Sequence, residues 1–260
     1  MAKKNVFSNI VNAFFKKILS VPENHSRELG NPQKIIIIRQ HNQLGDLLAG
    51  VPLFRAIKEK YPQSKITLVL SPVNYQGLTK NKYIDRIFIF DKKKLYNPSY
   101  FNDFNKLIRE NYDIALVPVV VSVSFTSNLI AGLTNAKIKI GPASLDGRIN
   151  ESSYFFDRRI DVDWRKQPDS NVSERSLDII RPFGITTNNY RSEITFDEHD
   201  AAEADKFIST LNKQPGEFLI GLHAGAGKAQ NRWSLDKYVE LINRVHENFP
   251  SRFYLTGSNT

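Results

Sequence analysis

Cysteine is absent from the 260-residue sequence, and methionine occurs only once. Without cysteine the chain forms no disulfide, binds no metal through thiolate and has no thiol nucleophile. This composition fits a reducing compartment. Thiol redox chemistry and cysteine-based catalysis are therefore excluded for this sequence.

Other metal-binding and catalytic patterns are also missing. The chain has five histidines, of which His41, His199 and His246 are scattered and do not form the HExxH spacing of a zinc site. No GxSxG sequence is present, so the signature of an α/β-hydrolase is absent. We therefore expect neither a metal nor another cofactor.

Long hydrophobic runs are missing too. A membrane-spanning helix needs roughly 18 apolar residues, whereas the longest uncharged apolar runs, such as residues 114–121, have the length of a strand. The N-terminus lacks the continuous apolar segment and the small-residue cleavage site of a signal peptide. We expect a cytoplasmic protein.

Residues 1–30 differ in pattern from the rest of the chain. Apolar residues recur at helical spacing between Val6 and Leu19, and lysines lie near both ends of this stretch. A basic amphipathic helix of this kind suits a membrane surface that carries anionic lipids. We expect the segment either to contact the cytoplasmic face of the inner membrane or to pack on the parent domain or a partner.

The charge balance is basic, with 36 Lys and Arg against 27 Asp and Glu and a formal net charge of +9. Such a balance suits nucleic acid, an anionic membrane, an anionic small substrate or a plain lysine-rich surface. The lysine runs at 16–17 and 92–94 are too short for a nucleic-acid arm, and no helix-turn-helix or RNP-like pattern accompanies them. We therefore expect no nucleic-acid partner, and the other three interpretations stay open.

Short apolar runs alternate with helical patterns from Lys34 onward. Pro52 should kink the first helix or mark a new first turn. The alternation predicts an α/β fold with an open parallel sheet, and residues 144–170 are expected to be irregular. Strands are expected at 35–38, 66–70, within 83–90, 114–121 and 137–140, and helices after residue 46, at 101–109, within 122–132 and at 173–181.

A second pattern of strand, loop, helix and strand follows a crossing segment at 186–200 and a helix at about 201–211. Its strands are expected at 218–222 and 252–255, with Ser234 as N-cap of the helix between them. Two strands and one helix hardly bury both faces of a sheet. Either residues 217–260 extend the first sheet, or, as we expect, the chain is a fragment with an incomplete second domain. We predict an extension at 1–30, one domain at 31–196 and the start of another at 197–260.

Two loops lie where a strand passes into a helix, the position at which open α/β sheets bind ligands. The first contains Gly45 and Asp46, although aspartate is also an ordinary residue in the first turn of a helix. The second, HAGAGKAQNRW from His223 to Trp233, combines small residues with positive charge. Such a loop at a helix N-terminus suits a diphosphate. Alternatively, its glycines only close the strand onto the helix.

Two familiar phosphate motifs do not fit the second loop. The Rossmann fingerprint needs a third glycine where Gln230 stands. A Walker A loop needs a glycine and a hydroxyl where Leu222 and Ala229 stand. Neither a dinucleotide enzyme nor a P-loop ATPase is therefore supported, and we expect a diphosphate cradle of another type.

Together the two loops resemble glycosyltransferase family 9, the ADP-heptose:lipopolysaccharide heptosyltransferases. KIIIIRQHNQLGDLLAGVPLFRAIKEKYP is similar to the family's opening strand, LGD turn and helix, and IGLHAGAGKAQNRWSLDKYVELINRV is similar to its donor loop. YIDRIFIFDK and VSERSLDIIRPFGI follow the family's pattern in the same order. The resemblance covers roughly residues 34–260.

The resemblance implies a GT-B fold, in which one Rossmann-like domain binds the acceptor and a second, incomplete in this chain, binds the nucleotide sugar. It implies inverting, metal-independent transfer of a heptose or related sugar from an ADP-sugar to a lipopolysaccharide-core or other glycan acceptor. Asp46 matches the aspartate proposed in the family as general base. The other implied site residues are Arg39, Asn42 and Gly45 for the acceptor, His223, Ala224, Gly225, Ala226, Gly227, Lys228 and Arg232 for the donor diphosphate, and Gly257 and Ser258 for the nucleoside.

The sequence departs from the family in two places. Asn231 stands where the family often has lysine, so Lys228 or Arg232 would supply that charge. The family's late D-[ST]-G-x-x-H motif is not among these residues, so we expect the chain alone to lack transferase activity. A glycosyltransferase-like module that binds nucleotide or glycan without transferring it, and an unrelated basic α/β protein, are the competing hypotheses.

Overall fold

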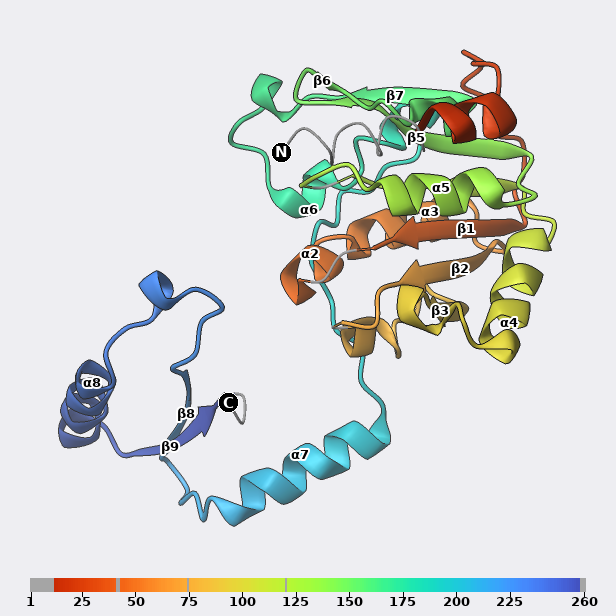
Figure 1. Ribbon diagram of the computed structural model, residues 1–260. Helices are drawn as coiled ribbons and strands as arrows, with labels where there is room; N and C mark the ends of the chain where they lie inside the picture. Colours follow the sequence, from red (N-terminus) through yellow and green to blue (C-terminus); the bar gives the residue numbers. More distant parts are fainter. Residues whose placement is uncertain (1–11, 41–42, 74, 120, 258–260) are drawn as a thin grey trace. The chain divides into compact units, whose positions relative to one another are not determined.

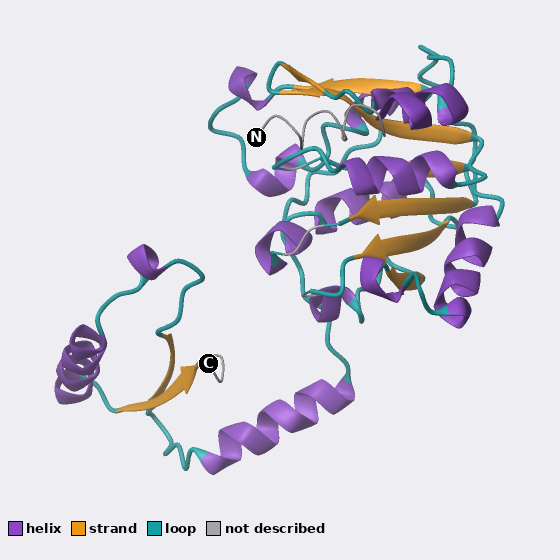
Figure 2. Ribbon diagram, in the orientation of Figure 1, coloured by secondary structure: helices purple, strands orange, loops and turns teal. Residues whose placement is uncertain are grey.

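The computed structural model describes residues 12–40, 43–73, 75–119 and 121–257. The chain divides into two compact units, Met1–Thr195 and Phe196–Thr260. The first unit contains strands β1 (Lys34–Arg39), β2 (Lys65–Leu70), β3 (Arg86–Ile89), β4 (Ile114–Leu116), β5 (Ile138–Leu145), β6 (Arg148–Ile149) and β7 (Arg158–Val162). Its α-helices are α2 (Leu44–Leu48), α3 (Val51–Lys60), α4 (Pro98–Arg109), α5 (Phe125–Leu133) and α6 (Val172–Arg175), together with short 3-10 turns (Figure 2).

The described strands of the first unit form one sheet in the order β3-β2-β1-β4-β5-β6, with β7 also paired to β5 (Figure 1). Every pair is parallel except that of the short strand β6, which runs antiparallel to β5. The carboxyl ends of β1, β2, β4, β5 and β7 therefore share one edge of the sheet, where open α/β folds bind ligands. The predicted α/β class with a parallel sheet is confirmed.

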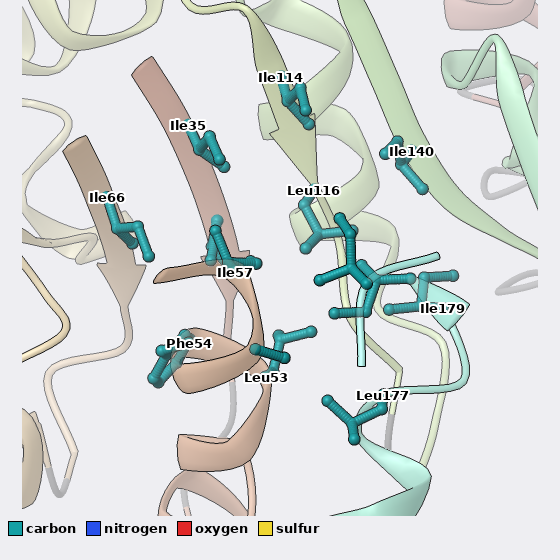
Figure 3. Packing of buried hydrophobic residues seen from close by; sticks show 14 of the residues in the cluster. Ile35, Leu53, Phe54, Ile57, Ile66, Ile114, Leu116, Ile140, Leu177 and Ile179 are labelled. Carbon is teal, nitrogen blue, oxygen red and sulfur yellow. The ribbon is translucent and has the colours of Figure 1, made fainter. Parts of the chain in front are cut away.

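One face of the sheet packs on α3 and on the segment that follows α6 (Figure 3). Helix α3 contributes Phe54 and Ile57, which are at most 1% exposed. Full burial of one such side chain stabilises the fold by about 1.5–3 kcal/mol. Pro52 lies in the first turn of α3, where its missing N–H is not needed. The expectation that Pro52 marks a new first turn is confirmed.

The opposite face of the sheet is also buried, so β1 is apolar on both sides. Ile36 and Ile38 pack there with residues of α4 and α5, and the rings of Phe90 and Phe104 lie 5.0 Å apart. Burial on both faces explains why β1 is a continuous apolar run without alternation.

The N-terminal helix, described over residues 12–19, packs on this second face. Phe15 and Leu19 contact the buried cluster, and the ring of Phe15 lies 6.1 Å from that of Phe125. The hydroxyl of Tyr154 donates to Oδ1 of Asn12 at 2.7 Å. The helix thus packs on the parent domain, as one alternative predicted, and the predicted positions before residue 12 lie outside the described residues.

Asp85 joins the start of β2 to α3. Its Oδ2 accepts hydrogen bonds from the N–H of Ile66 at 2.9 Å and from Nζ of Lys58 at 2.7 Å. Nζ of Lys65 donates to Oδ1 at 3.1 Å. Burial raises the pKa of the Asp85 carboxyl, but these donors outweigh it, so the pKa lies below its ordinary value.

Strand β5 corrects one prediction, because it does not end before Gly141 and Pro142. It continues to Leu145, and Pro142 is paired with Ile160 of β7. On the other side β4 ends opposite Ile140, so the missing N–H of Pro142 removes no ladder hydrogen bond with β4. The expected strand at 114–121 is likewise shorter, since β4 pairs only over Ile114–Leu116.

The segments predicted as irregular and as a long helix also differ from expectation. Residues 144–170 include β6 and β7. In β7, with the sequence RRIDV, buried and more exposed residues alternate, but the pattern is not visible in the sequence because one of the buried residues is an arginine. The helix expected at 173–181 spans only α6. Leu177 and Ile179 are both buried in the same cluster, whereas an α-helix would place residues two apart on different faces.

The second unit contains α7 (Glu198–Thr210), β8 (Phe218–His223), α8 (Leu235–Asn248) and β9 (Ser251–Thr256). Strands β8 and β9 pair in parallel along their whole length, with His223 opposite Thr256. They form their own two-stranded sheet, so the described residues of this segment, 217–257, do not extend the first sheet. None of the helices in the described part of the chain has the length and hydropathy needed to cross a bilayer.

Candidate functional site

The first candidate loop follows β1 at the carboxyl edge of the large sheet. Arg39 is the last residue of β1, and α2 begins at Leu44. Residues 41 and 42 lie outside the described residues, and the predicted acceptor contact Asn42 is one of them. Gly45 is exposed, and a Cβ at its position would meet no described atom within 4 Å.

Asp46 lies in the first turn of α2 and is partly exposed. A carboxylate there interacts favourably with the positive end of the helix, although five residues give only a small dipole. Leu47, the next residue, is fully buried, so one side of this turn is anchored in the core. The structure thus places Asp46 on an anchored turn at the ligand-binding edge of the sheet.

Arg39 lies beneath this turn and is only 1% exposed. Its Nη2 donates a hydrogen bond to the backbone carbonyl of Asp46. Burial lowers the pKa of the Arg39 guanidinium to about 10, and the charge of Asp46 partly opposes this. Among the described residues, Nε and Nη1 have no hydrogen-bond partner.

Gly50 lies against the same guanidinium, between α2 and α3. A Cβ at position 50 would lie 2.0 Å from Nη1 and 2.8 Å from Cζ of Arg39. Its φ is −86°, a value that any residue adopts. A side chain at this position would therefore have to displace the guanidinium of Arg39, whereas the backbone conformation sets no limit on the residue type.

The second candidate loop follows β8 and leads into α8. His223 ends β8, and its Nδ1 lies 3.0 Å from Oγ1 of Thr256 on β9. The hydroxyl of Tyr238 in α8 donates to the carbonyl of His223 at 3.2 Å. Strand, helix and neighbouring strand therefore fix the start of this loop together.

Within this loop, Arg232 is exposed and its Nε donates to the carbonyl of Ala226 at 3.0 Å. Ala224 and Gly225 follow the strand, and Lys228 is exposed just before the 3-10 turn Ala229–Asn231. The loop presents two cations and several small residues at the carboxyl edge of β8.

Neither glycine of the loop is needed for close packing in the described structure. A Cβ on Gly225 would come no nearer than 3.4 Å, to Nε2 of His223, and a Cβ on Gly227 would meet no described atom within 4 Å. Neither glycine has a positive φ. The alternative that they only close the strand onto the helix is not supported by this geometry.

The remaining predicted residues of this unit lie at its ends. Ser234 occupies the N-cap position of α8, as predicted, although its side chain makes no capping hydrogen bond. Gly257 follows β9 and is exposed, whereas Ser258 lies outside the described residues.

A group of carboxylates and one histidine lies at the start of α7. Ligand atoms of Asp197, His199 and Asp200 lie within 4.8 Å of one another. Asp197 and Asp200 form a capping box, in which each side chain accepts a hydrogen bond from the backbone N–H of the other. The cluster is explained by helix capping, and it gives no reason to propose a metal.

Gly50, Arg55 and Thr256 make contacts that were not predicted from the sequence. Gly50 had a signal, because glycine is unfavourable inside a helical pattern and its presence there points to a packing or functional reason. Arg55 had one too, because it stands within the apolar stripe of α3 between Phe54 and Ile57. Nothing in the local sequence pointed to Thr256 as a neighbour of His223, since that contact depends on strand pairing.

The fold is similar to that of solved glycosyltransferases. The crystal structure of the glycosyl transferase family 9 from Veillonella parvula matches with a TM-score of 0.72 and 18% identity, over 93% of this chain and 65% of that one. E. coli ADP-heptose lps heptosyltransferase II matches with a TM-score of 0.64 and 16% identity, over 87% of this chain and 65% of that one. These similarities confirm the predicted α/β fold class of the GT-B type.

Comparison of the sequence with protein-family profiles identifies the family. The profile of glycosyltransferase family 9 (heptosyltransferase) matches residues 102–260, more than half of the chain, and the chain therefore belongs to this family. Lipopolysaccharide core heptosyltransferase OpsX from Haemophilus influenzae is 22% identical over 217 residues, which cover 83% of this chain and 58% of that protein. The matched residues of the profile include the loop after β8, whereas Asp46 lies before them.

Proposed function

We propose that the full-length protein transfers a heptose or related sugar from an ADP-sugar to a lipopolysaccharide-core or other glycan acceptor. Family membership supports glycosyl transfer, and a related protein is an ADP-heptose heptosyltransferase by name. The observation that carries the proposal is Asp46, a partly exposed carboxylate on an anchored turn at the carboxyl edge of the sheet.

In the proposed reaction Asp46 is the general base. Its carboxylate takes the proton of an acceptor hydroxyl while that oxygen attacks the anomeric carbon of the donor sugar. The bond from this carbon to the diphosphate oxygen breaks, and ADP leaves with the electron pair. Attack opposite the leaving group inverts the anomeric carbon. Asn42 and the exposed backbone at Gly45 are the proposed acceptor contacts, whereas the burial of Arg39 favours a supporting role.

The loop after β8 is the proposed donor site. A diphosphate leaving group needs its charge stabilised, and backbone N–H groups with cationic side chains do this without a metal. Residues 223–228 would supply the backbone, Lys228 and Arg232 the positive charge, and Gly257 and Ser258 contacts to the nucleoside. The open space around Gly227 supports this role, because a cradle for phosphate needs room at the backbone.

We further propose that the N-terminal helix rests on the cytoplasmic face of the inner membrane. Phe15 and Leu19 are used for packing on the domain, whereas Phe14 and Ile18 are 59% and 60% exposed. Phe14 and Ile18 are one helical turn apart and therefore form one outward stripe beside exposed lysines. Such a stripe with positive charge suits anionic lipids.

A binding module without transferase activity is the alternative function. Asn231 in place of the family's lysine is the observation that favours it. The two functions differ in one measurable property, since a module binds nucleotide or glycan but releases no ADP that depends on acceptor.

The test is release of ADP by the full-length protein from ADP-heptose in the presence of a core-glycan acceptor, beside Asp46→Asn. We expect release that needs acceptor and falls by at least about 100-fold in the variant, in line with general-base contributions of about 10²–10⁴-fold. Equal ADP release by the variant would support the proposed transferase activity but would rule out Asp46 as the general base. Tight ADP binding without release, across several ADP-sugars and acceptors, would favour the binding module.

A further inference from the structure

A buried arginine lies under the turn that carries the proposed base. The guanidinium of Arg39 is 1% exposed, and its Nη2 donates to the carbonyl oxygen of Asp46. This hydrogen bond holds the peptide unit between Asp46 and Leu47, and so affects where the Asp46 side chain leaves the backbone. Because Nε and Nη1 are also buried, the glycan acceptor cannot reach the guanidinium without displacing the turn.

The space for this guanidinium is provided by Gly50. Any side chain at position 50 would begin with a Cβ 2.0 Å from Nη1, well inside van der Waals contact. The backbone at Gly50 adopts an ordinary conformation, so its lack of a side chain serves Arg39 and not the chain direction. Arg39 at the end of β1 and Gly50 before α3 therefore both affect the hydrogen bond to the carbonyl of Asp46.

We propose that Arg39 is a positioning residue which fixes the Asp46 turn from below, and that Gly50 keeps the space it needs. This inference rests on the proposed function, in which Asp46 is the base. A hydrogen bond from a charged donor is stronger than one between neutral groups. A base misplaced by about 1 Å loses on the order of 100-fold in rate.

The chain offers a matched control. Arg158, at the start of β7, is also a buried arginine, 6% exposed, whose Nε and Nη1 lack hydrogen-bond partners among the described residues. Its Nη1 lies 3.5 Å from Oδ1 of Asp157 in an ion pair. Arg158 lies at the opposite end of a strand from the ligand-binding edge. Loss of Arg158 therefore reports what removal of a buried arginine does to stability alone.

The first measurement needs no substrate. In the turn, the amide of Leu47 donates to the carbonyl of Gln43 at 3.2 Å and that of Ala49 to Gly45 at 2.9 Å. Hydrogen exchange of these two amides in the full-length protein should be at least about 10-fold faster in Arg39→Met, relative to amides of α4 in the same sample. Arg158→Met should leave that ratio unchanged. An unchanged ratio in Arg39→Met would overturn the inference.

The second measurement separates positioning from acceptor binding. Arg39→Met and Gly50→Ala should each lower kcat by about 30–100-fold, with little change in the KM for donor or acceptor, and Arg158→Met should change neither. Arg39→Lys should recover part of the lost kcat, since an ammonium also donates to a carbonyl. A rise confined to the acceptor KM would show that Arg39 binds acceptor and would refute positioning.

A double variant tests whether Gly50 acts through Arg39. In Arg39→Ala the two guanidinium atoms within 3.0 Å of a Cβ at position 50 are gone, and the carbonyl oxygen of Leu47 remains at 3.2 Å. Arg39→Ala/Gly50→Ala should therefore be no slower than Arg39→Ala. Additive losses would refute this coupling. If Asp46→Asn keeps full turnover, the proposed base fails, while the exchange measurement still decides the support of the turn by Arg39.

Discussion

Removal of the Arg55 side chain should destabilise the first unit by breaking the hydrogen bonds that join α3 to residues 189–193. Arg55 lies in α3, and its side chain is 3% exposed. Its Nη1 donates to the carbonyl of Asn189 at 2.5 Å, and its Nη2 to the carbonyl of Arg191 at 3.1 Å and to Oε2 of Glu193 at 2.9 Å. The guanidinium thus holds the last segment of the first unit, residues 189–193, against the helix that follows the Asp46 turn.

The expected magnitude follows from the environment of each bond. A hydrogen bond from a charged donor contributes about 1.5–3 kcal/mol, and the two carbonyl bonds are the protected ones. The ion pair with Glu193 contributes at most about 1 kcal/mol, because that carboxylate is 43% exposed. Methionine retains most of the apolar stem, so Arg55→Met should cost about 3–6 kcal/mol through the two carbonyl bonds. For a unit of this size the Tm should fall by roughly 6–24 °C.

The assay is urea unfolding of the chain followed by tryptophan fluorescence. The chain has two tryptophans, Trp164 in the first unit and Trp233 in the second, so in a Trp233→Phe background the signal reports the first unit alone. Glu193→Gln in the same background is the matched control and should cost no more than about 1 kcal/mol. Equal losses in Arg55→Met and Glu193→Gln would refute the reasoning, because the carbonyl bonds would then contribute nothing.

Acid titration, membrane binding and nucleotide binding test three other parts of the chain. Because the folded pKa of Asp85 lies below its ordinary 3.8, its stabilising effect is present above that pH and lost as pH falls through the lowered pKa. Asp85→Asn should therefore lower stability at neutral pH and weaken the acid dependence in unfolding curves; an unchanged dependence would contradict this. Phe14→Ser/Ile18→Ser should weaken co-sedimentation with anionic vesicles without changing the Tm of the protein. Unaltered sedimentation would rule out the stripe formed by Phe14 and Ile18 as a membrane contact. Arg232→Gln should weaken ADP binding by the full-length protein by about 10-fold in calorimetry, and equal affinity would exclude a phosphate contact.

The architecture could be predicted from sequence where packing and local pattern agree. The strands at β1 and β2 and the helix after Ser234 follow directly from their apolar periodicity. Prediction failed where tertiary contacts decide the outcome. Pro142 is accepted inside β5 because β4 has already ended on that side, and a single sequence does not contain that information. Leu177 and Ile179 lie in turns instead of a helix, and both side chains are buried in the same hydrophobic cluster.

The candidate site shows the same division. Motif resemblance placed Asp46 and the loop from His223 on strand ends, and the structure puts both at the carboxyl edges of parallel strands. It could not show that Arg39 is buried, because an arginine after a strand is as consistent with ligand contact as with support. Gly50 is informative only together with the position of the guanidinium, and that position depends on how α2 and α3 meet β1.

Each of the two candidate sites has an arginine that donates to a backbone carbonyl of its loop, and the two arginines differ in burial. Arg39 on Asp46 is buried, whereas Arg232 on Ala226 is exposed. An exposed hydrogen bond to a carbonyl contributes little in water, and a charge-assisted bond to phosphate is roughly twice as strong as a neutral one. A diphosphate should therefore draw Arg232 away from the carbonyl of Ala226, while nothing of comparable strength reaches Arg39. A structure of the full-length protein with ADP should show Arg232 released and Arg39 still bound to Asp46, and the reverse pattern would mean that the supporting and ligand-binding roles have been assigned to the wrong arginines.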